Sequence, residues 1–154
     1  MMKITKQEIE QRMERFEEVC RNSGMKLTHQ RMEIFREVAQ TGDHPDAKKV
    51  YQGVRERMST VSQDTVYRTL WMLKDLGLIT TLGPPREQAR FDANLSHHHH
   101  FVCVRCGLTR DFYSDVFDEL RLPDAVKAFG RVETTQVEVK GVCLKCNAKE
   151  KKLS

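Results

Sequence analysis

Apolar side chains recur at helical spacing along the first half of the chain. In the first segment they lie three or four residues apart, at Ile9, Met13, Phe16 and Cys20. This spacing places them on one face of a helix. Thr5, followed three residues later by Glu8, fits a capping box. The sequence therefore predicts a helix that begins after Thr5 and ends near Gly24.

Three more segments with the same periodicity predict three further helices. They cover residues 28–41, 45–58 and 62–76. Small polar side chains stand near their starts, where such groups accept hydrogen bonds from unpaired backbone amides. These residues are Thr28, Asp46 and Ser62.

A β-hairpin is expected after the fourth helix. Residues 78–82 and 88–92 are short strand-like segments, and the turn-forming run Gly83-Pro84-Pro85 lies between them. Helices followed by a short hairpin are typical of a winged helix-turn-helix domain, which we expect over residues 1–84. The helix before the hairpin enters the DNA major groove in helix-turn-helix proteins. An ordinary amphipathic helix, or a winged helix that binds another protein, fits the same pattern.

The second half of the chain has a different pattern. Residues 98–104 and 108–113 are expected to form strands around a turn, and residues 131–143 alternate like a strand. Residues 115–129 are helix-like, although Pro123 interrupts them. We therefore expect an α+β protein, with a hinge over residues 85–91 and a small α/β domain over residues 92–154.

Composition limits the possible functions. The 154 residues are enough for one ordinary domain or two small ones. No apolar run approaches the roughly 18–20 residues of a membrane helix, and the first residues lack an apolar signal core. We therefore expect a cytoplasmic protein without a membrane partner. The formal charge of +4 lies mostly in residues 1–90 and permits a nucleic-acid partner on that half.

The cysteines indicate a metal site. Four of the five form two C-x-x-C pairs, at Cys103, Cys106, Cys143 and Cys146. In an unexported protein thiols stay reduced, and two such pairs supply four thiolates for tetrahedral zinc. A redox dithiol is the alternative, but the sequence has no thioredoxin-like surroundings. Cys20 completes an apolar stripe and is expected to lie in a helix core.

The run of four histidines at residues 97–100 has several interpretations. It fits an affinity-tag remnant, a solvated loop or metal ligands. In a strand, alternation places His98 and His100 on one face, where two imidazoles share an ion. Imidazole and carboxylate suit Fe(II), Mn(II) or Zn(II). Further candidates for this second site are His44, Asp92 and Asp111.

Several motifs together resemble the ferric uptake regulator (Fur) family of bacterial metal-responsive repressors. In chain order they are GMKLTHQR, DHPDAKKVY, STVSQDTVYRTL, RFD, HHHHFVCVRCG and GVCLKC. The resemblance covers roughly residues 16–148. It implies a homodimer with an N-terminal winged helix and a C-terminal dimerisation domain, in which the four paired cysteines bind structural zinc. It implies operator DNA as the partner, with no enzymatic activity and no small organic substrate.

The resemblance also implies functional residues. The regulatory metal, Fe(II) or Mn(II), would bind His44, Asp92, His98, His100 and Asp111. The DNA-contacting side chains would include Lys26, Arg31, Tyr67 and Arg68. Thr65 joins them as a non-core position of the predicted recognition helix, which also carries Gln63 and Lys74.

Asp111 links the chain to one branch of the family. Iron-sensing members commonly carry Glu at this position, whereas Asp resembles the peroxide-sensing (PerR-type) branch. In that branch peroxide reacts with bound Fe(II) and ligand histidines are oxidised, and the matching positions are His44 and His98. A reversible Fur-like iron sensor or Zur-like zinc sensor is the alternative. A zinc-dependent enzyme is a third hypothesis. Four thiolates, however, leave zinc no open coordination position for a substrate or water.

Two departures from the family pattern affect these expectations. Some members have a third metal site, for which His97, His99 and Asp118 are available. Thr135 stands where that site's last histidine would be, so the set is incomplete. Asp64 replaces the usual Ala at the start of the recognition helix. A carboxylate there favours the helix dipole but repels phosphate, so it affects the operator preference.

Overall fold

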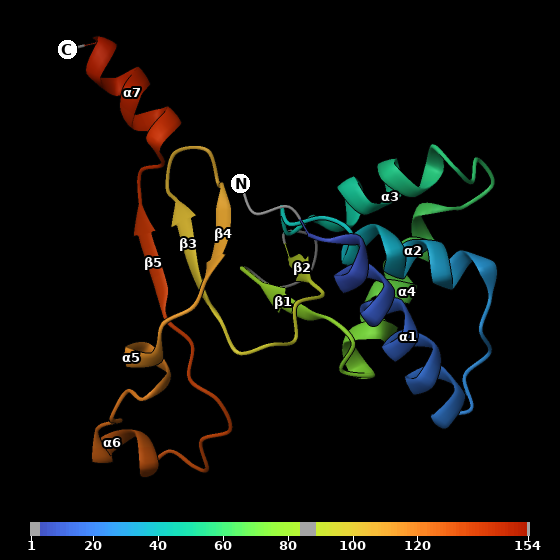
Figure 1. Cartoon of the computed structure of the whole chain (residues 1–154), viewed down its shortest axis with the longest axis horizontal. Helices are drawn as coiled ribbons and strands as arrows, with labels where there is room; N and C mark the ends of the chain where they lie inside the picture. Colours follow the sequence, from blue (N-terminus) through green and yellow to red (C-terminus); the bar gives the residue numbers. More distant parts are fainter. Residues whose placement is uncertain (1–3, 84–88, 154) are drawn as a thin grey trace. The chain divides into compact units, whose positions relative to one another are not determined.

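The computed structural model describes residues 4–83 and 89–153, which form two compact units that meet in sequence at Leu95 and Ser96 (Figure 1). The expected hinge covers residues 85–91, of which residues 85–88 lie outside the described part. Arg90 and Phe91 belong to a strand of the first unit. The division between the units thus falls after the expected hinge, because backbone pairing holds these residues in the first unit.

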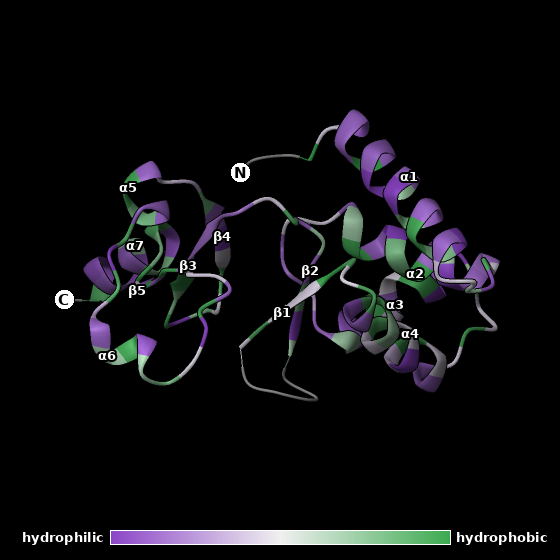
Figure 2. Ribbon diagram, turned by 90° about the horizontal axis from the view of Figure 1, so that it is seen from below, coloured by the Kyte–Doolittle hydropathy of each residue, from purple (hydrophilic) through white to green (hydrophobic). Residues whose placement is uncertain are grey.

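The four predicted helices of the first unit are confirmed. They are α1 (Lys6–Asn22), α2 (His29–Ala39), α3 (Ala47–Arg55) and α4 (Gln63–Asp75). Each begins after a polar side chain that accepts a backbone N–H, and Thr5 and Glu8 form the predicted capping box at α1. In Figure 2, hydrophobic positions recur along a mostly hydrophilic α1. This stripe is the face that the sequence pattern predicted.

The core of the first unit forms around α2, which packs against α1, α3 and α4. Phe16 of α1 stacks on Phe35 of α2, with 4.8 Å between the ring centroids. Cys20 is buried in the same cluster, as predicted, and burial raises the pKa of its thiol. The other members of this cluster are apolar, which fits a domain that folds by burying apolar surface.

The predicted hairpin consists of β1 (Thr80–Leu82) and β2 (Arg90–Asp92), which pair antiparallel. The expected turn at Gly83-Pro84-Pro85 extends into the part of the chain that is not described. An isolated bridge between Asp46 and Arg90 also joins β2 to the start of α3. The first unit therefore has the helices and hairpin of a winged helix.

The second unit contains a three-stranded sheet in the order β4-β3-β5. Its strands are β3 (His99–Cys103), β4 (Thr109–Phe112) and β5 (Glu138–Gly141). The β3–β4 pair is antiparallel and the β3–β5 pair is parallel. Of the strand predicted over residues 131–143, only β5 forms. Its four residues pair with residues 100–103 of β3. The α+β fold class is confirmed.

The helices of the second unit differ from the sequence pattern. The helix-like stretch 115–129 is two short helices, α5 (Asp115–Asp118) and α6 (Asp124–Lys127), and Pro123 stands at the N-cap of α6. The helix α7 (Leu144–Leu153) was not predicted. It buries no residue, so it lacks the apolar stripe by which helices are recognised in a sequence.

The second unit buries few apolar side chains. Among its described residues, the buried ones are all histidine, cysteine or threonine: His98, His99, His100, Cys103, Thr109 and Cys143. Val116, Phe129 and Leu144 are instead largely exposed. A unit of this kind needs support beyond its own core, such as metal or a second chain. No helix in the described residues is long and apolar enough to cross a membrane.

We predict that Leu70→Ala destabilises the first unit by about 2–5 kcal/mol, because Leu70 is fully buried on α4 and the substitution leaves a cavity. Urea unfolding followed by the emission of Trp71, the only tryptophan, measures this change. Leu27→Ala is the control, since Leu27 is 43% exposed and should cost about 0.5 kcal/mol or less. Equal losses in the two variants would contradict the described core.

Candidate metal centres and nucleic-acid interface

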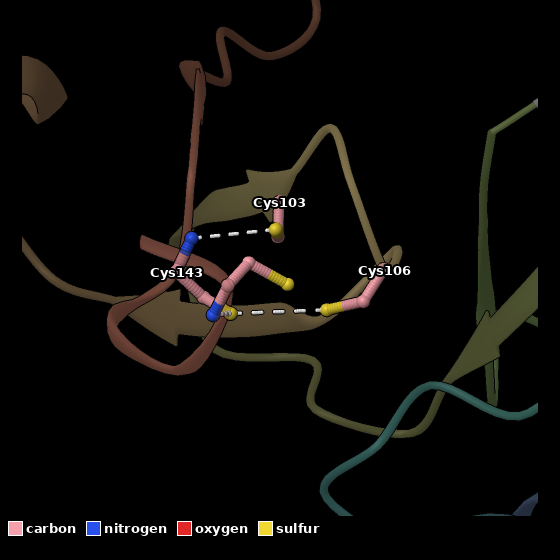
Figure 3. Close-up of side chains that lie close together, drawn as sticks. Cys103, Cys106 and Cys143 are labelled. Atoms are coloured by element: carbon pink, nitrogen blue, oxygen red, sulfur yellow. Dashed lines mark hydrogen bonds between the residues drawn. The ribbon is translucent and has the colours of Figure 1, made fainter. Parts of the chain in front are cut away.

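The four paired cysteines come together in the second unit. Cys103 ends β3, Cys106 lies in the following turn, and Cys143 and Cys146 stand at the start of α7. Their four sulfur atoms all lie within 4.8 Å of one another. The Cys106 and Cys143 sulfurs, joined in Figure 3, are 3.8 Å apart. Zinc–sulfur bonds of about 2.3 Å in a tetrahedron give an edge of about 3.8 Å, so the donor set fits zinc.

Backbone amides prepare the sulfurs for a cation. The Cys143 N–H donates to the Cys103 sulfur at 3.3 Å (Figure 3). Hydrogen bonds from the Cys106 and Cys143 amides lower the pKa of Cys103 to about 6. The pKa of Cys146 is raised to about 12, first by its hydrogen bond to the Cys143 sulfur and then by burial. Hydrogen bonds from the chain thus favour the thiolate form of Cys103, whereas the Cys146 thiol needs a bound cation to lose its proton.

His44 and Asp92 pair within the first unit. The His44 Nε2 and Asp92 Oδ2 atoms are 3.3 Å apart, and both side chains are buried. His44 has a φ of 52°, the only positive φ outside glycine among the described residues. The Arg90 guanidinium donates to the carbonyl oxygens of Asp43 and His44, at 2.8 Å each. This role of Arg90 was not predicted from the sequence, because the residue pattern does not indicate a left-handed backbone at His44.

Three other predicted ligands meet within the second unit. The Nε2 atoms of His98 and His100 are 3.1 Å apart. The Asp111 Oδ1 atom lies 3.6 Å from His98 Nε2 and 3.2 Å from His100 Nε2. The register of β3 and β4 causes this, since His100 is opposite Asp111. Two imidazoles and a carboxylate converging on one point suit Fe(II), Mn(II) or Zn(II) better than a thiolate-preferring ion.

A third cluster joins His97, His99 and Asp118 in the second unit. The Asp118 Oδ1 atom lies 2.8 Å from His99 Nε2 and 3.0 Å from His97 Nδ1. The other ring nitrogen of His97 lies 2.7 Å from the Thr135 carbonyl oxygen, and that of His99 accepts the Val137 N–H. The Thr135 backbone carbonyl thus contacts His97, and residue 135 offers no imidazole to this cluster. Hydrogen bonds satisfy this cluster, which links β3 to the segment before β5.

The candidate DNA-contacting side chains of α4 differ in exposure. Arg68 is 79% exposed, and its Nε lies 3.0 Å from Asp64 Oδ2 one turn earlier. Tyr67 is half-buried, with its ring edge-on to Trp71 at 6.1 Å between centroids. The Thr65 hydroxyl lies 2.8 Å from that of Ser62, the N-cap residue. Arg68 is therefore the most accessible of the three for contact with a groove.

The remaining two candidates are Lys26, in the loop before α2, and Arg31, in the first turn of α2. The Arg31 guanidinium donates to the Lys26 carbonyl oxygen at 2.6 Å. Lys26 is exposed and Arg31 is half-buried. Arg31 thus fixes the backbone that carries Lys26. The resemblance implied DNA contact for both residues and did not indicate that one positions the other.

Comparisons with known proteins show the family and the fold. A model of the ferric uptake regulator family matches residues 22–140. The peroxide-responsive repressor PerR of Staphylococcus epidermidis is 33% identical over 127 residues, which span 82% of this chain and 84% of that protein. The Francisella tularensis ferric uptake regulator, solved with iron, is 28% identical with a TM-score of 0.67, covering 80% of this chain and 96% of its own. The Helicobacter pylori ferric uptake regulator shares the fold, with a TM-score of 0.73 at 22% identity and coverage of 96% and 97%.

We predict that Cys103→Ser lowers the zinc content from about one ion per chain to less than about a tenth, because a structural site needs all four thiolates. The helical and strand signals of the second unit should weaken with it, since metal binding is coupled to folding. Metal analysis and circular dichroism of the purified protein measure both effects. Cys20→Ser removes a buried thiol from the first unit and should keep the zinc. Full zinc content in Cys103→Ser would contradict the assignment.

Proposed function

Because the chain belongs to the ferric uptake regulator family of metal-responsive transcriptional regulators, we propose that it is a metal-dependent repressor that binds operator DNA as a homodimer in the cytoplasm. The observation that carries the proposal is the pairing of imidazole with carboxylate in each unit: His44 with Asp92, and His100 with Asp111. Each pair alone offers too few ligands to hold an ion tightly. Together they supply the ligands that a regulatory ion needs.

The proposed regulatory ion, Fe(II) or Mn(II), binds ligands from both units. The ligand set consists of His44, Asp92, His98, His100 and Asp111. An ion that takes ligands from both units restricts how the units move relative to each other. It needs to favour one arrangement by only a few kcal/mol to change the occupancy of DNA. Zinc at the four cysteines has a separate role, which is to hold the second unit together.

The proposed DNA contact uses α4 as the recognition helix. In a dimer, two such helices enter successive major grooves about 34 Å apart. Arg68 suits guanine or phosphate, and the Tyr67 ring suits a thymine methyl group. Thr65, Lys26 and Arg31 complete the proposed contact surface. The exposed apolar side chains of the second unit support the assignment of that unit to dimerisation.

We propose that peroxide is the signal. The likeness to peroxide-responsive relatives and the carboxylate of Asp111 support this assignment. Fe(II) held by these ligands would supply the redox chemistry that activates hydrogen peroxide. The chain contributes the imidazoles of His44 and His98. In the net reaction the peroxide O–O bond breaks, one oxygen atom is added to a ring carbon of either imidazole, and the other oxygen atom leaves as water, so the imidazole is oxidised by two electrons and the peroxide is reduced. An oxidised imidazole is a poorer ligand, so the ion leaves and the repressor releases DNA.

The second candidate is a repressor that senses the supply of iron or zinc by reversible binding. The likeness to an iron-containing ferric uptake regulator favours it, at 28% identity and a TM-score of 0.67. The same ligands bind the ion in both cases. The two functions differ in whether the histidines are chemically changed when DNA is released.

We predict that peroxide adds one oxygen atom to His44 or His98 in Fe(II)-loaded protein and abolishes its DNA binding. Protein loaded with Mn(II) should be unchanged, because Mn(II) does not reduce peroxide in this way. Peptide mass spectrometry locates the oxygen, and a gel-shift assay measures the binding. His29 is an exposed histidine outside the ligand set and should stay unmodified. Intact histidines with unchanged DNA binding would favour the reversible sensor.

We predict that Arg68→Ala weakens operator binding by about 1–3 kcal/mol, or roughly 5- to 150-fold in Kd. Asp64→Ala should have the opposite effect, because it removes the carboxylate 3.0 Å from Arg68 Nε. Fluorescence anisotropy with a labelled operator at fixed salt measures both. Arg131→Ala is the charge-matched control, since Arg131 is 87% exposed in the second unit. Equal weakening in Arg68→Ala and Arg131→Ala would show that only net charge matters.

A further inference from the structure

The three residues of β2 contact two parts of the first unit, the loop that carries His44 and the helix α4. Asp92 pairs with His44. Arg90 donates to the backbone of the loop that carries His44. Phe91 packs edge-on against Trp71 of α4, with 5.9 Å between ring centroids and an angle of 78° between the planes. We propose that β2 transmits regulatory metal binding to the recognition helix inside the first unit, with Arg90 as a positioning residue for His44.

The first step of this path lies between Arg90 and the His44 loop. The guanidinium binds two consecutive carbonyl oxygens, those of Asp43 and His44, at 2.8 Å each. The next carbonyl, that of Pro45, accepts the Phe91 N–H at 2.9 Å. These contacts surround a residue whose φ of 52° is unfavourable for a side chain with a Cβ. The neighbouring strand therefore holds the His44 backbone in a conformation that it would otherwise leave.

The second step lies between Phe91 and α4. Phe91 is 1% exposed, so its ring has no room to move independently of its neighbours. Trp71, which it contacts, is in turn edge-on to Tyr67 one turn earlier on the same helix. Tyr67 and Arg68 are the proposed base contacts. An aromatic series thus runs from β2 to the surface that would read DNA.

The two steps share the backbone of β2. A metal ion on His44 and Asp92 sets the spacing between the loop and β2. The position of β2 determines the position of the Phe91 ring. Because this ring contacts Trp71, it determines how α4 is rotated about its own axis. The inference rests on the proposed function and adds to it. Metal binding prepares the recognition helix within one unit, as well as restricting the movement of the two units.

The only tryptophan of the chain gives a direct measurement. Mn(II) is titrated into zinc-loaded protein, with binding followed by calorimetry and the position of the Trp71 emission maximum recorded in parallel. The wavelength is used rather than the intensity, because a paramagnetic ion quenches emission. The wild type should show a shift of the maximum that follows the binding curve. An emission maximum that stays constant through the titration would overturn the inference.

Phe91→Leu should bind Mn(II) within about threefold of the wild type and lose the shift. Its metal-induced gain in operator affinity should fall about tenfold, within the range of typical coupling between sites. Phe16→Leu is the matched control. Phe16 is equally buried in the same unit but stacks on Phe35, away from β2. Equal effects of the two substitutions would show that Phe91 acts only through the stability of the core, and would overturn the inference.

Arg90→Lys keeps the charge but loses the fork that reaches two carbonyl oxygens. Its Mn(II) affinity should fall by about tenfold or more, as for other residues that orient a ligand. Arg12→Lys is the control, because Arg12 donates to the single Ala39 carbonyl of the same unit at 2.8 Å. If Arg90→Lys bound Mn(II) as tightly as the wild type, Arg90 would not be a positioning residue for His44. Mn(II) binding without any gain in DNA affinity in the wild type would instead contradict the proposed function.

Discussion

The interior of the second unit consists of polar and sulfur-containing side chains rather than aliphatic ones. Its buried residues in the described part of the chain are histidines, cysteines and a threonine. Burying imidazoles or thiolates costs free energy unless they are hydrogen-bonded or bound to a cation. The stability of this unit therefore depends on how these groups are bonded. The first unit has an apolar core, and β2 links it to sensing only in the mechanism that we propose.

The ligands are divided by chemical softness. The four sulfurs form a closed set at the end of β3 and the start of α7, which suits a permanent zinc ion. The imidazole and carboxylate pairs of His44 with Asp92 and His100 with Asp111 suit ions that exchange or undergo redox chemistry. In the proposed function, this difference in donor atoms keeps a structural ion apart from a regulatory one. The proposed signalling depends on this separation.

Local signals in the sequence predicted most of the fold. The capping box at Thr5 and Glu8 located α1, because it depends on residues close in sequence. The two C-x-x-C pairs indicated the sulfur cluster although Cys106 and Cys143 are 37 positions apart, because two such pairs supply the four thiolates of a zinc site. The sequence did not predict α7, which has no apolar stripe, or the Arg90 contacts, which join residues more than forty positions apart. The His44 backbone also escaped prediction. Its left-handed conformation is imposed by those distant contacts rather than by local preference.

The central claim is that one regulatory ion takes ligands from both units. Calorimetric titration of zinc-loaded protein with Mn(II) tests it most directly, in the wild type and in His44→Ala, His98→Ala and His29→Ala. The account predicts one Mn(II) per chain, with an affinity about tenfold to 100-fold lower when either His44 or His98 is removed, and no change for His29→Ala. Mn(II) binding that is unaffected by His44→Ala would place the ion in the second unit alone and contradict the account.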